Sequence, residues 1–271
     1  MMKGDEIIAE VAPAFVGQFG ENIPPEKVAP LLKEFGFKEV YEVALGADIS
    51  AVCEAELFLS DVPSKQPFLA TSCCPSWASM AKKLFPEIAH CVSEGFTPMV
   101  ATARMIKKKH PNSKIVFIGP CSAKKLEAMR KSVRSDVDFV ITFEEMVGMF
   151  TAKGIVSDFG CRPEPFNKST AAGRGYAKSG GVAEAIINSI KEKEPDRQIK
   201  TECADNLSDC RKMLSLARAG KRDGYILEGM ACPGGCIGGA GTTLHQKKAM
   251  AAINKYKELS EKKLAEQHDE I

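Results

Sequence analysis

Short apolar runs alternate with longer amphipathic segments along the chain. The apolar runs are four or five residues long, a length that suits buried parallel strands. These runs are Tyr41–Leu45, Pro67–Thr71, Ile115–Gly119, Asp138–Thr142 and Gly224–Leu227. Because strands that alternate with helices form parallel sheet, the pattern predicts an α/β protein in which helices flank the strands.

The segments between these runs carry helix signals. Thr142 followed by Glu145 is a capping box, so a helix should begin at Phe143. Ser179 and Gly180 mark the start of another. The predicted helices are Pro98–Lys109, Phe143–Lys153, Gly181–Lys191 and Lys247–Gln267.

The chain length bounds the domain organisation. A chain of 271 residues forms one large domain or two small ones, and no internal repeat divides it. The polar segment Gly160–Ser169 is the best candidate for a loop. We therefore expect a single domain over residues 1–271 with two lobes, and a lobe boundary near residues 160–169.

Composition and charge exclude several classes of protein. The chain is 44% hydrophobic and 27% charged, unlike a disordered protein. Its net charge of +2 is far from the basic excess of a nucleic-acid binder, so no nucleic acid is expected as a partner. No apolar stretch reaches about 18 residues, so no membrane span is expected. Asp5, Glu6 and Glu10 stand where a signal peptide needs an apolar core, which predicts a cytoplasmic protein.

The ten cysteines suggest metal chemistry. Disulfides are rare in cytoplasmic chains, so buried thiols, metal ligands or catalytic thiols are expected. Three cysteine motifs each follow a predicted strand: Cys73-Cys74, Cys121 and the pair Cys232 and Cys236. Ligands of open α/β sheets bind beyond the carboxyl ends of the strands, so the three loops can converge on one site.

The spacing of these cysteines leaves three readings open. Cys121 lies 47 residues after Cys74, and Cys232 lies 111 residues after Cys121, unlike the close pairs of a zinc ribbon. Four thiolates suit an iron–sulfur cube. A zinc site and inert buried thiols are the alternatives. Because adjacent side chains can hardly both point at one metal corner, either Cys73 or Cys74 is expected to be a free thiol able to carry protons.

Three long motifs resemble the signatures of the catalytic domain of the iron-only (FeFe) hydrogenases. They are TSCCPSW at Thr71–Trp77, GPCSAKKLE at Gly119–Glu127 and EGMACPGGCIGG at Glu228–Gly239. The resemblance extends to Ala12–Ala14, Leu45–Asp48, Asp136–Asp138 and Ser169–Glu184, so it covers most of the chain. It implies a fold with two lobes of parallel sheet and a metal cluster between them at the carboxyl ends of the strands.

The resemblance also implies the family's H-cluster, a 4Fe–4S cube joined to a di-iron unit that carries CO, CN and an azadithiolate bridge. By motif position, the cube ligands are Cys74, Cys121, Cys232 and Cys236, and Cys236 also bridges to the di-iron unit. Around the cofactor, Lys124 would hydrogen-bond a cyanide and Met230 would pack beside the di-iron unit. Pro13, Ala14 and Pro120 would complete the binding site.

A proton relay is the second implication of the resemblance. The family's relay maps onto Cys73, Glu127, Ser93 and Glu56, although Ser93 and Glu56 taken alone would be read as surface residues. The chain has no C-x-x-C-x-x-C run, so electrons would come directly from a ferredoxin or similar electron carrier, unless the chain is a catalytic fragment of a longer protein. Separate maturation proteins would supply the di-iron unit.

Departures from the family pattern leave more than one function open. Gly119 stands where the family usually has methionine, which predicts extra space beside the di-iron unit. Tyr176 stands where phenylalanine is common, and Ala14 where many relatives have serine. The leading hypothesis is an enzyme that reversibly interconverts protons plus electrons and molecular hydrogen, with heterolytic cleavage. The alternatives are a hydrogen sensor without turnover and an iron–sulfur assembly factor.

Overall fold

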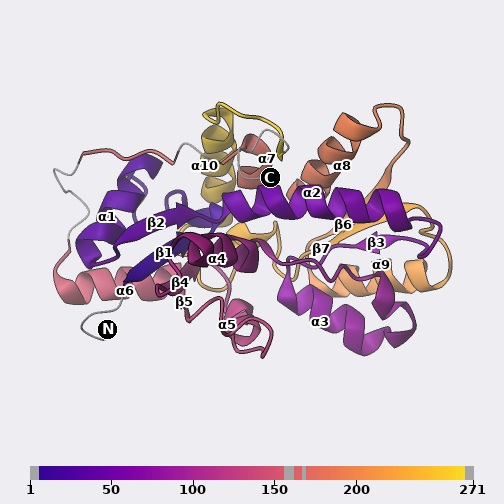
Figure 1. Ribbon diagram of the computed structural model, residues 1–271, viewed down its shortest axis with the longest axis horizontal. Helices are drawn as coiled ribbons and strands as arrows, with labels where there is room; N and C mark the ends of the chain where they lie inside the picture. The colour runs from indigo at the N-terminus through magenta and orange to yellow at the C-terminus, as the bar shows by residue number, and fades with distance from the viewer. Residues whose placement is uncertain (1–5, 156–161, 167–168, 266–271) are drawn as a thin grey trace.

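Two parallel sheets lie side by side along the long axis of the molecule (Figure 1). The structure is a computed structural model that describes residues 6–155, 162–166 and 169–265. The first sheet has the order β2-β1-β4-β5, and the second has the order β3-β7-β6. The strands are β1 (Ile7–Val11), β2 (Glu39–Glu42), β3 (Leu69–Ala70), β4 (Lys114–Gly119), β5 (Phe139–Thr142), β6 (Lys200–Ala204) and β7 (Tyr225–Gly229). Every strand pair is parallel, so the predicted α/β class with two lobes is confirmed.

The first lobe is the four-stranded sheet with the helices that cover it. Those helices are α1 (Val28–Phe35), α4 (Pro98–Lys109), α6 (Phe143–Lys153) and α10 (Gln246–Glu258). Its core contains the fully buried side chains of Ile8, Phe15, Ile118 and Phe143. The predicted capping box begins α6, because Glu145 N–H donates to the Thr142 hydroxyl while the Glu145 carboxylate accepts from Thr142 N–H.

The second lobe is the three-stranded sheet with helices on both faces. One face packs against α2 (Ala44–Asp61) and α8 (Gly181–Lys193), and the other packs against α3 (Pro75–Leu84) and α9 (Leu207–Arg218). The remaining helices are the short α5 (Ala123–Ala128) and α7 (Ala171–Gly175) and the 3-10 turns Pro13–Phe15, Pro25–Lys27, Pro86–Cys91 and Cys236–Gly238. The long helix α2 contacts both α4 and α8, so it ties the two lobes together (Figure 1).

Some element predictions are confirmed and others are wrong. Strands β4, β5 and β7 and helices α4, α6 and α8 lie where they were predicted, within three residues at each end. The apolar run Tyr41–Leu45 is not one strand, because β2 ends at Glu42 and α2 begins at Ala44. The strands β1 and β6 and the helices α1, α2, α3 and α9 were missed. Glu10 interrupts the apolar pattern of β1, and α2 is buried on several sides, so neither shows a clear period.

The C-terminal helix is shorter than predicted. It ends at Glu258, and the chain then turns so that the Ser260 hydroxyl accepts a hydrogen bond from Arg174. The last two residues predicted for this helix, 266 and 267, lie outside the described residues. Of the proposed lobe boundary, residues 160, 161, 167 and 168 also lie outside them. Within that boundary, Glu164 pairs with Lys33 of the first lobe.

In the parts of the chain that the structure describes, we find no helix with the length and hydropathy needed to span a bilayer.

Candidate metal centre between the lobes

A cavity of about 80 Å³ lies where the chain leaves the carboxyl ends of strands in both sheets. Most of its wall comes from the segments after β1, β3, β4 and β7, and the rest includes Phe117 of β4, Met99 of α4 and Tyr176 after α7. Many of the residues predicted for the site line this cavity, namely Pro13, Ala14, Cys73, Cys74, Pro120, Cys121, Lys124, Met230, Cys232 and Cys236. The structure thus brings ten predicted residues to one place, and their roles there stay predictions.

The loop that carries Cys73 and Cys74 is held by the tryptophan that follows it. Trp77 is fully buried on α3, and its indole N–H donates to the Thr71 carbonyl at 2.8 Å. A side chain at Gly229 would collide with the Trp77 ring, so the glycine lets β7 pack directly on the indole. Cys74 is the N-cap of α3 and its sulfur accepts a hydrogen bond from Ala231 N–H at 3.4 Å. This packing fixes Cys74 against the loop that follows β7.

The loop with Cys232 and Cys236 depends on two glycines with left-handed backbone. Gly234 has φ 74° and Gly235 has φ 91°, values that L side chains rarely adopt. A Cβ on Gly235 would also lie 2.6 Å from the backbone nitrogen of Ser179. The two glycines therefore let the loop turn tightly and bring both sulfurs to the cavity.

The four predicted ligand thiols surround a volume rather than a point. Among the described residues, no three His, Cys, Asp or Glu side chains come close enough together to hold a single metal ion. Burial raises the pKa of Cys121, Cys232 and Cys236, and the neighbouring thiols raise the pKa of Cys232 and Cys236 further. A group with net positive charge and several corners would relieve this repulsion and accept thiolates.

Lys124 brings a positive charge to the cavity wall. It lies on α5, and its ammonium pairs with the Glu127 carboxylate at 2.7 Å. The Thr97 hydroxyl donates to the other Glu127 oxygen at 2.7 Å. Burial disfavours the ammonium, but the Glu127 carboxylate outweighs this effect and raises the pKa of Lys124. The lysine is therefore charged, buried and available to an anionic group in the cavity.

Two buried polar side chains near Lys124 and the cavity have no hydrogen-bond partner among the described residues. The Tyr176 hydroxyl, on a residue that lines the cavity, makes no hydrogen bond within the described part of the chain. Neither carboxyl oxygen of Glu10 on β1 has one, and burial raises its pKa well above the ordinary range. An unpaired buried hydroxyl costs about 1–3 kcal/mol, so a group bound in the cavity would find a donor ready at Tyr176.

The space beside Gly119 is filled, contrary to the sequence prediction. A Cβ built on Gly119 would lie 2.5 Å from the Phe117 ring, and that ring lines the cavity. The small residue therefore makes room for a neighbouring aromatic side chain rather than opening the site.

Glu54 is a buried acid that the sequence analysis missed. It lies on α2 with 6% of its surface exposed, close to the Ser93 hydroxyl and the Ser72 N–H. Burial raises the pKa of Glu54 to about 7. Burial also raises the pKa of the Cys73 thiol, and the Glu54 charge raises it further. Ser93, Glu54 and Cys73 thus form a series of groups that can exchange protons, and this series leads toward the cavity.

The structure does not bring Glu56 to this series. Its side chain is 62% exposed and pairs with Lys193 at 2.6 Å. Two residues along a helix turn a side chain by about 200°, so Glu56 lies on the face opposite Glu54. Glu54 could have been identified from its place in the buried stripe of Ala47, Ala51 and Phe58. That stripe can be recognised only when residues 44–61 are known to form a helix.

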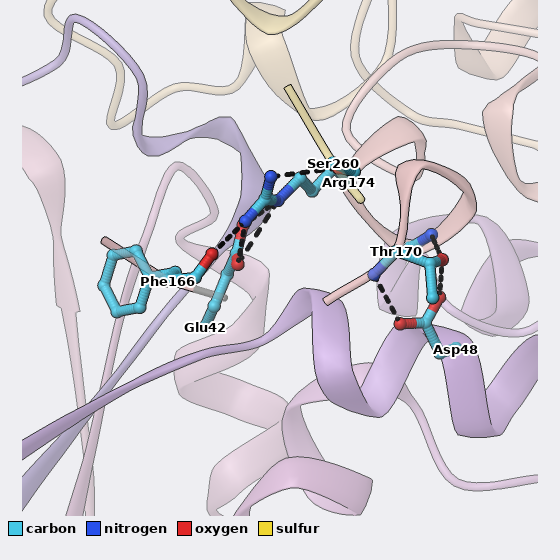
Figure 2. Close-up of polar contacts among 7 residues, drawn as sticks. Glu42, Asp48, Phe166, Thr170, Arg174 and Ser260 are labelled. Atoms are coloured by element: carbon cyan, nitrogen blue, oxygen red, sulfur yellow. Dashed lines mark hydrogen bonds and ion pairs between the residues drawn. The ribbon is translucent and has the colours of Figure 1, made fainter. Parts of the chain in front are cut away.

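Two buried carboxylates hold the segment between the lobes that leads to Tyr176 (Figure 2). Arg174 on α7 donates from Nε to Glu42, at the end of β2, at 3.1 Å, and from Nη1 to Ser260 at 2.9 Å. Asp48 on α2 accepts from the Thr170 hydroxyl at 2.5 Å and from Thr170 N–H at 3.1 Å. Helix α7 is therefore tied to the first lobe by charge and to the second by a hydroxyl and an amide.

Known proteins resemble this chain over most of its length. The NADP-reducing hydrogenase subunit HndD of Solidesulfovibrio fructosivorans is 28% identical over 297 residues, covering 88% of this chain and 50% of that protein. The cytosolic Fe-S cluster assembly factor NAR1 of Kluyveromyces lactis is 29% identical over 181 residues, covering 62% of this chain and 38% of that protein. The chain spans about half the length, or less, of these curated relatives.

A solved structure has the same fold. The FeFe-hydrogenase HydA1 of Chlamydomonas reinhardtii matches with a TM-score of 0.77 and 22% sequence identity, covering 99% of this chain and 90% of that one. The family model for the C-terminal domain of the iron only hydrogenase large subunit matches residues 5–240. The chain therefore belongs to this family, the C-terminal domains of iron-only hydrogenase large subunits.

Proposed function

We propose that the cavity holds an H-cluster and that the chain interconverts protons plus electrons and molecular hydrogen. The observation that carries this proposal is the convergence of four thiols, a fifth thiol and a buried ammonium on one cavity. Cys74, Cys121, Cys232 and Cys236 would bind a 4Fe–4S cube, and Cys236 would also bridge to a di-iron unit. When bound, this cofactor supplies the redox chemistry that the protein side chains lack.

The residues of the chain would bind and orient the di-iron unit. The Lys124 ammonium can turn from Glu127 to a cyanide, and a charge-assisted hydrogen bond is roughly twice as strong as a neutral one. Pro13, Ala14, Pro120 and Met230 supply apolar contacts. The apolar wall keeps bulk water away, which strengthens the charged contact inside the cavity.

Protons would pass between the cavity and solvent through Cys73. A proton that leaves the Cys73 sulfur goes to a Glu54 oxygen, and Glu54 exchanges a proton with the Ser93 hydroxyl. In this route Glu54 stands between Cys73 and Ser93, the position that the predicted relay gave to Glu127, because Glu127 pairs with Lys124 and Thr97. Glu56 has no part in it. A group with a pKa of about 7 both accepts and releases protons near neutral pH, as general acid–base catalysis requires.

Other proteins would complete the reaction. Electrons would come from a ferredoxin or similar carrier, and maturation proteins would deliver the di-iron unit. A second function, iron–sulfur cluster assembly, is favoured by the similarity to NAR1. Against it stand Cys73 and the Lys124–Glu127 pair, which a site without hydrogen chemistry does not need.

Infrared spectroscopy tests the proposal. The chain is reconstituted anaerobically with iron and sulfide and then given a synthetic di-iron precursor. We expect protein-bound CO and CN bands that shift under dihydrogen, together with hydrogen evolution in a dye-linked assay. Bands without turnover would instead support a hydrogen sensor. A loaded cube without any bands would support the assembly function.

A further inference from the structure

A groove of about 480 Å³ lies beside the cavity and opens to solvent. It lies between α3, the segment of residues 93–97 and α5. The residues of its wall that matter here are Lys82, Ser93, Glu94, Thr97, Glu127 and Arg130. Since a water molecule occupies about 30 Å³, the groove has room for on the order of ten waters.

The groove reaches both buried acids beside the cavity. Glu127 is only 2% exposed and lines the groove directly. Ser93 also lines it, and the Ser93 hydroxyl lies close to the Glu54 carboxyl. The backbone holds Ser93 in place, because Ser93 N–H donates to the Ala70 carbonyl at 2.8 Å and its Oγ accepts from Gly95 N–H at 3.1 Å.

The mouth of the groove carries an exposed carboxylate. The Glu94 side chain is 91% exposed and lies 4.0 Å from the Lys82 ammonium. Glu94 follows Ser93 directly in the chain. No comparable path leads from Ser93 to Glu56 among the described residues, because Glu56 lies on the outer face of α2 and lines neither the cavity nor the groove.

We propose that this groove is the solvent port of the proton route and that Glu94 is its proton-collecting residue. This inference rests on the proposed function, because the groove needs to carry protons only if hydrogen chemistry takes place in the cavity. The groove itself is a feature of the structure. A protonated Glu94 releases its proton to water in the groove, and that water protonates Ser93 Oγ as the Ser93 hydroxyl proton passes to a Glu54 oxygen. One O–H bond breaks and one forms at each step, so no other reactant is needed.

The exchange of deuterium into Glu54 measures access through the port without any cofactor. The carbonyl stretch of the protonated acid is followed by infrared spectroscopy after transfer of the apoprotein into D₂O, at a pH about one unit below 7. Glu54→Gln identifies the band by removing it. Because this readout needs no iron, it stays informative even where hydrogen turnover fails.

A plug in the groove gives the largest expected effect. Ser79 on α3 lines the groove, and Ser79→Trp would fill much of it. We expect Glu54 exchange to slow by more than about tenfold, because it then depends on local opening of the lobe. The matched control is Thr151→Trp, which places the same ring in a separate surface pocket on α6 and should leave the rate unchanged. Wild-type exchange in Ser79→Trp, with the ring seen in the groove by crystallography, would overturn the port.

Glu94 and Glu56 are both surface glutamates that pair with a lysine. Substituting each in turn therefore distinguishes an exit at the groove from an exit on α2. Glu94→Gln should slow Glu54 exchange several-fold, and Glu56→Gln should leave it unchanged. In the reconstituted enzyme, Glu94→Gln should also move the fall in hydrogen evolution at high pH to a lower pH, whereas Glu56→Gln should not. A slower exchange in Glu56→Gln than in Glu94→Gln would reject Glu94 and return the exit to α2.

Discussion

The two lobes contribute different chemistry to the cavity between them. The second lobe carries Cys74, Cys232 and Cys236 after β3 and β7, and also the extra thiol Cys73. The first lobe carries a single thiol, Cys121, and the only cation that lines the cavity in the described chain, Lys124. A cluster bound to all four predicted ligands would therefore join the lobes covalently through Cys121 alone.

Removal of Cys121 should have the largest effect on this arrangement. In Cys121→Ala the three remaining ligand thiols belong to one lobe, and we expect the cube to be lost. Iron content and visible absorption after anaerobic reconstitution measure this loss. Binding of the cube to the folded state should raise the Tm of the unmodified chain, and this rise should be absent in Cys121→Ala.

A cysteine away from the cavity provides the control for Cys121. Cys203 is exposed on β6 and lines no wall of the cavity. Cys203→Ala should bind as much iron as the unmodified chain. Full iron content in Cys121→Ala would show that the first lobe supplies no ligand, and equal losses in both variants would show that the loss is not specific to the cavity.

The extra thiol of the second lobe should affect turnover without affecting binding. Cys73→Ala keeps the four ligands but removes the proton carrier next to Glu54. Since general acid–base groups contribute on the order of 10²–10⁴-fold, hydrogen evolution should fall by that factor while iron content and infrared bands are retained. Cys73→Asp, which restores a titratable group, should recover part of the rate. Full activity of Cys73→Ala would exclude the route through Glu54.

How far the sequence predicts the site also differs between the lobes. Loops that follow strands place Cys73, Cys121 and Cys236 at one edge, because parallel strands end together, and local patterns suffice for that. Glu54 needs more, since its burial depends on how α2 packs between two lobes. The choice between Glu54 and Glu56 is a matter of helix phase, and the apolar pattern of α2 is too uniform to fix it. The prediction of extra space beside Gly119 was wrong for a related reason, because the Phe117 ring that fills this space lies two residues earlier on the same strand.

The ties that hold α7 to the two lobes should differ in strength. Arg174 and Glu42 form a buried ion pair, 4% and 1% exposed. Arg174→Met leaves the Glu42 charge unpaired, which typically costs about 3–5 kcal/mol of unfolding free energy. Denaturation with urea measures the loss. Adding Glu42→Gln removes the stranded charge, so the double variant should be more stable than Arg174→Met alone.

The tie to the second lobe should be weaker and dependent on pH. Burial raises the pKa of Asp48 to about 7 from 3.8, and the Thr170 hydroxyl only partly offsets this. The folded state therefore holds this proton more tightly than the unfolded chain does. The resulting stability is complete below pH 3.8 and is lost as the pH rises through about 7.

Asp48→Asn should remove that dependence while keeping the hydrogen bonds. Its amide can donate to the Thr170 hydroxyl and its oxygen can accept from Thr170 N–H, as the protonated acid does. Between pH 4 and 7 the unfolding free energy should fall less steeply, by up to about 1.4 kcal/mol per pH unit. Above pH 7 the variant should be the more stable protein. Asp209→Asn is the control, because the Lys212 contact lowers the pKa of that exposed acid and confines its effect to lower pH. An unchanged slope in Asp48→Asn would mean that Asp48 stays ionised when folded, and that both ties of α7 are charged.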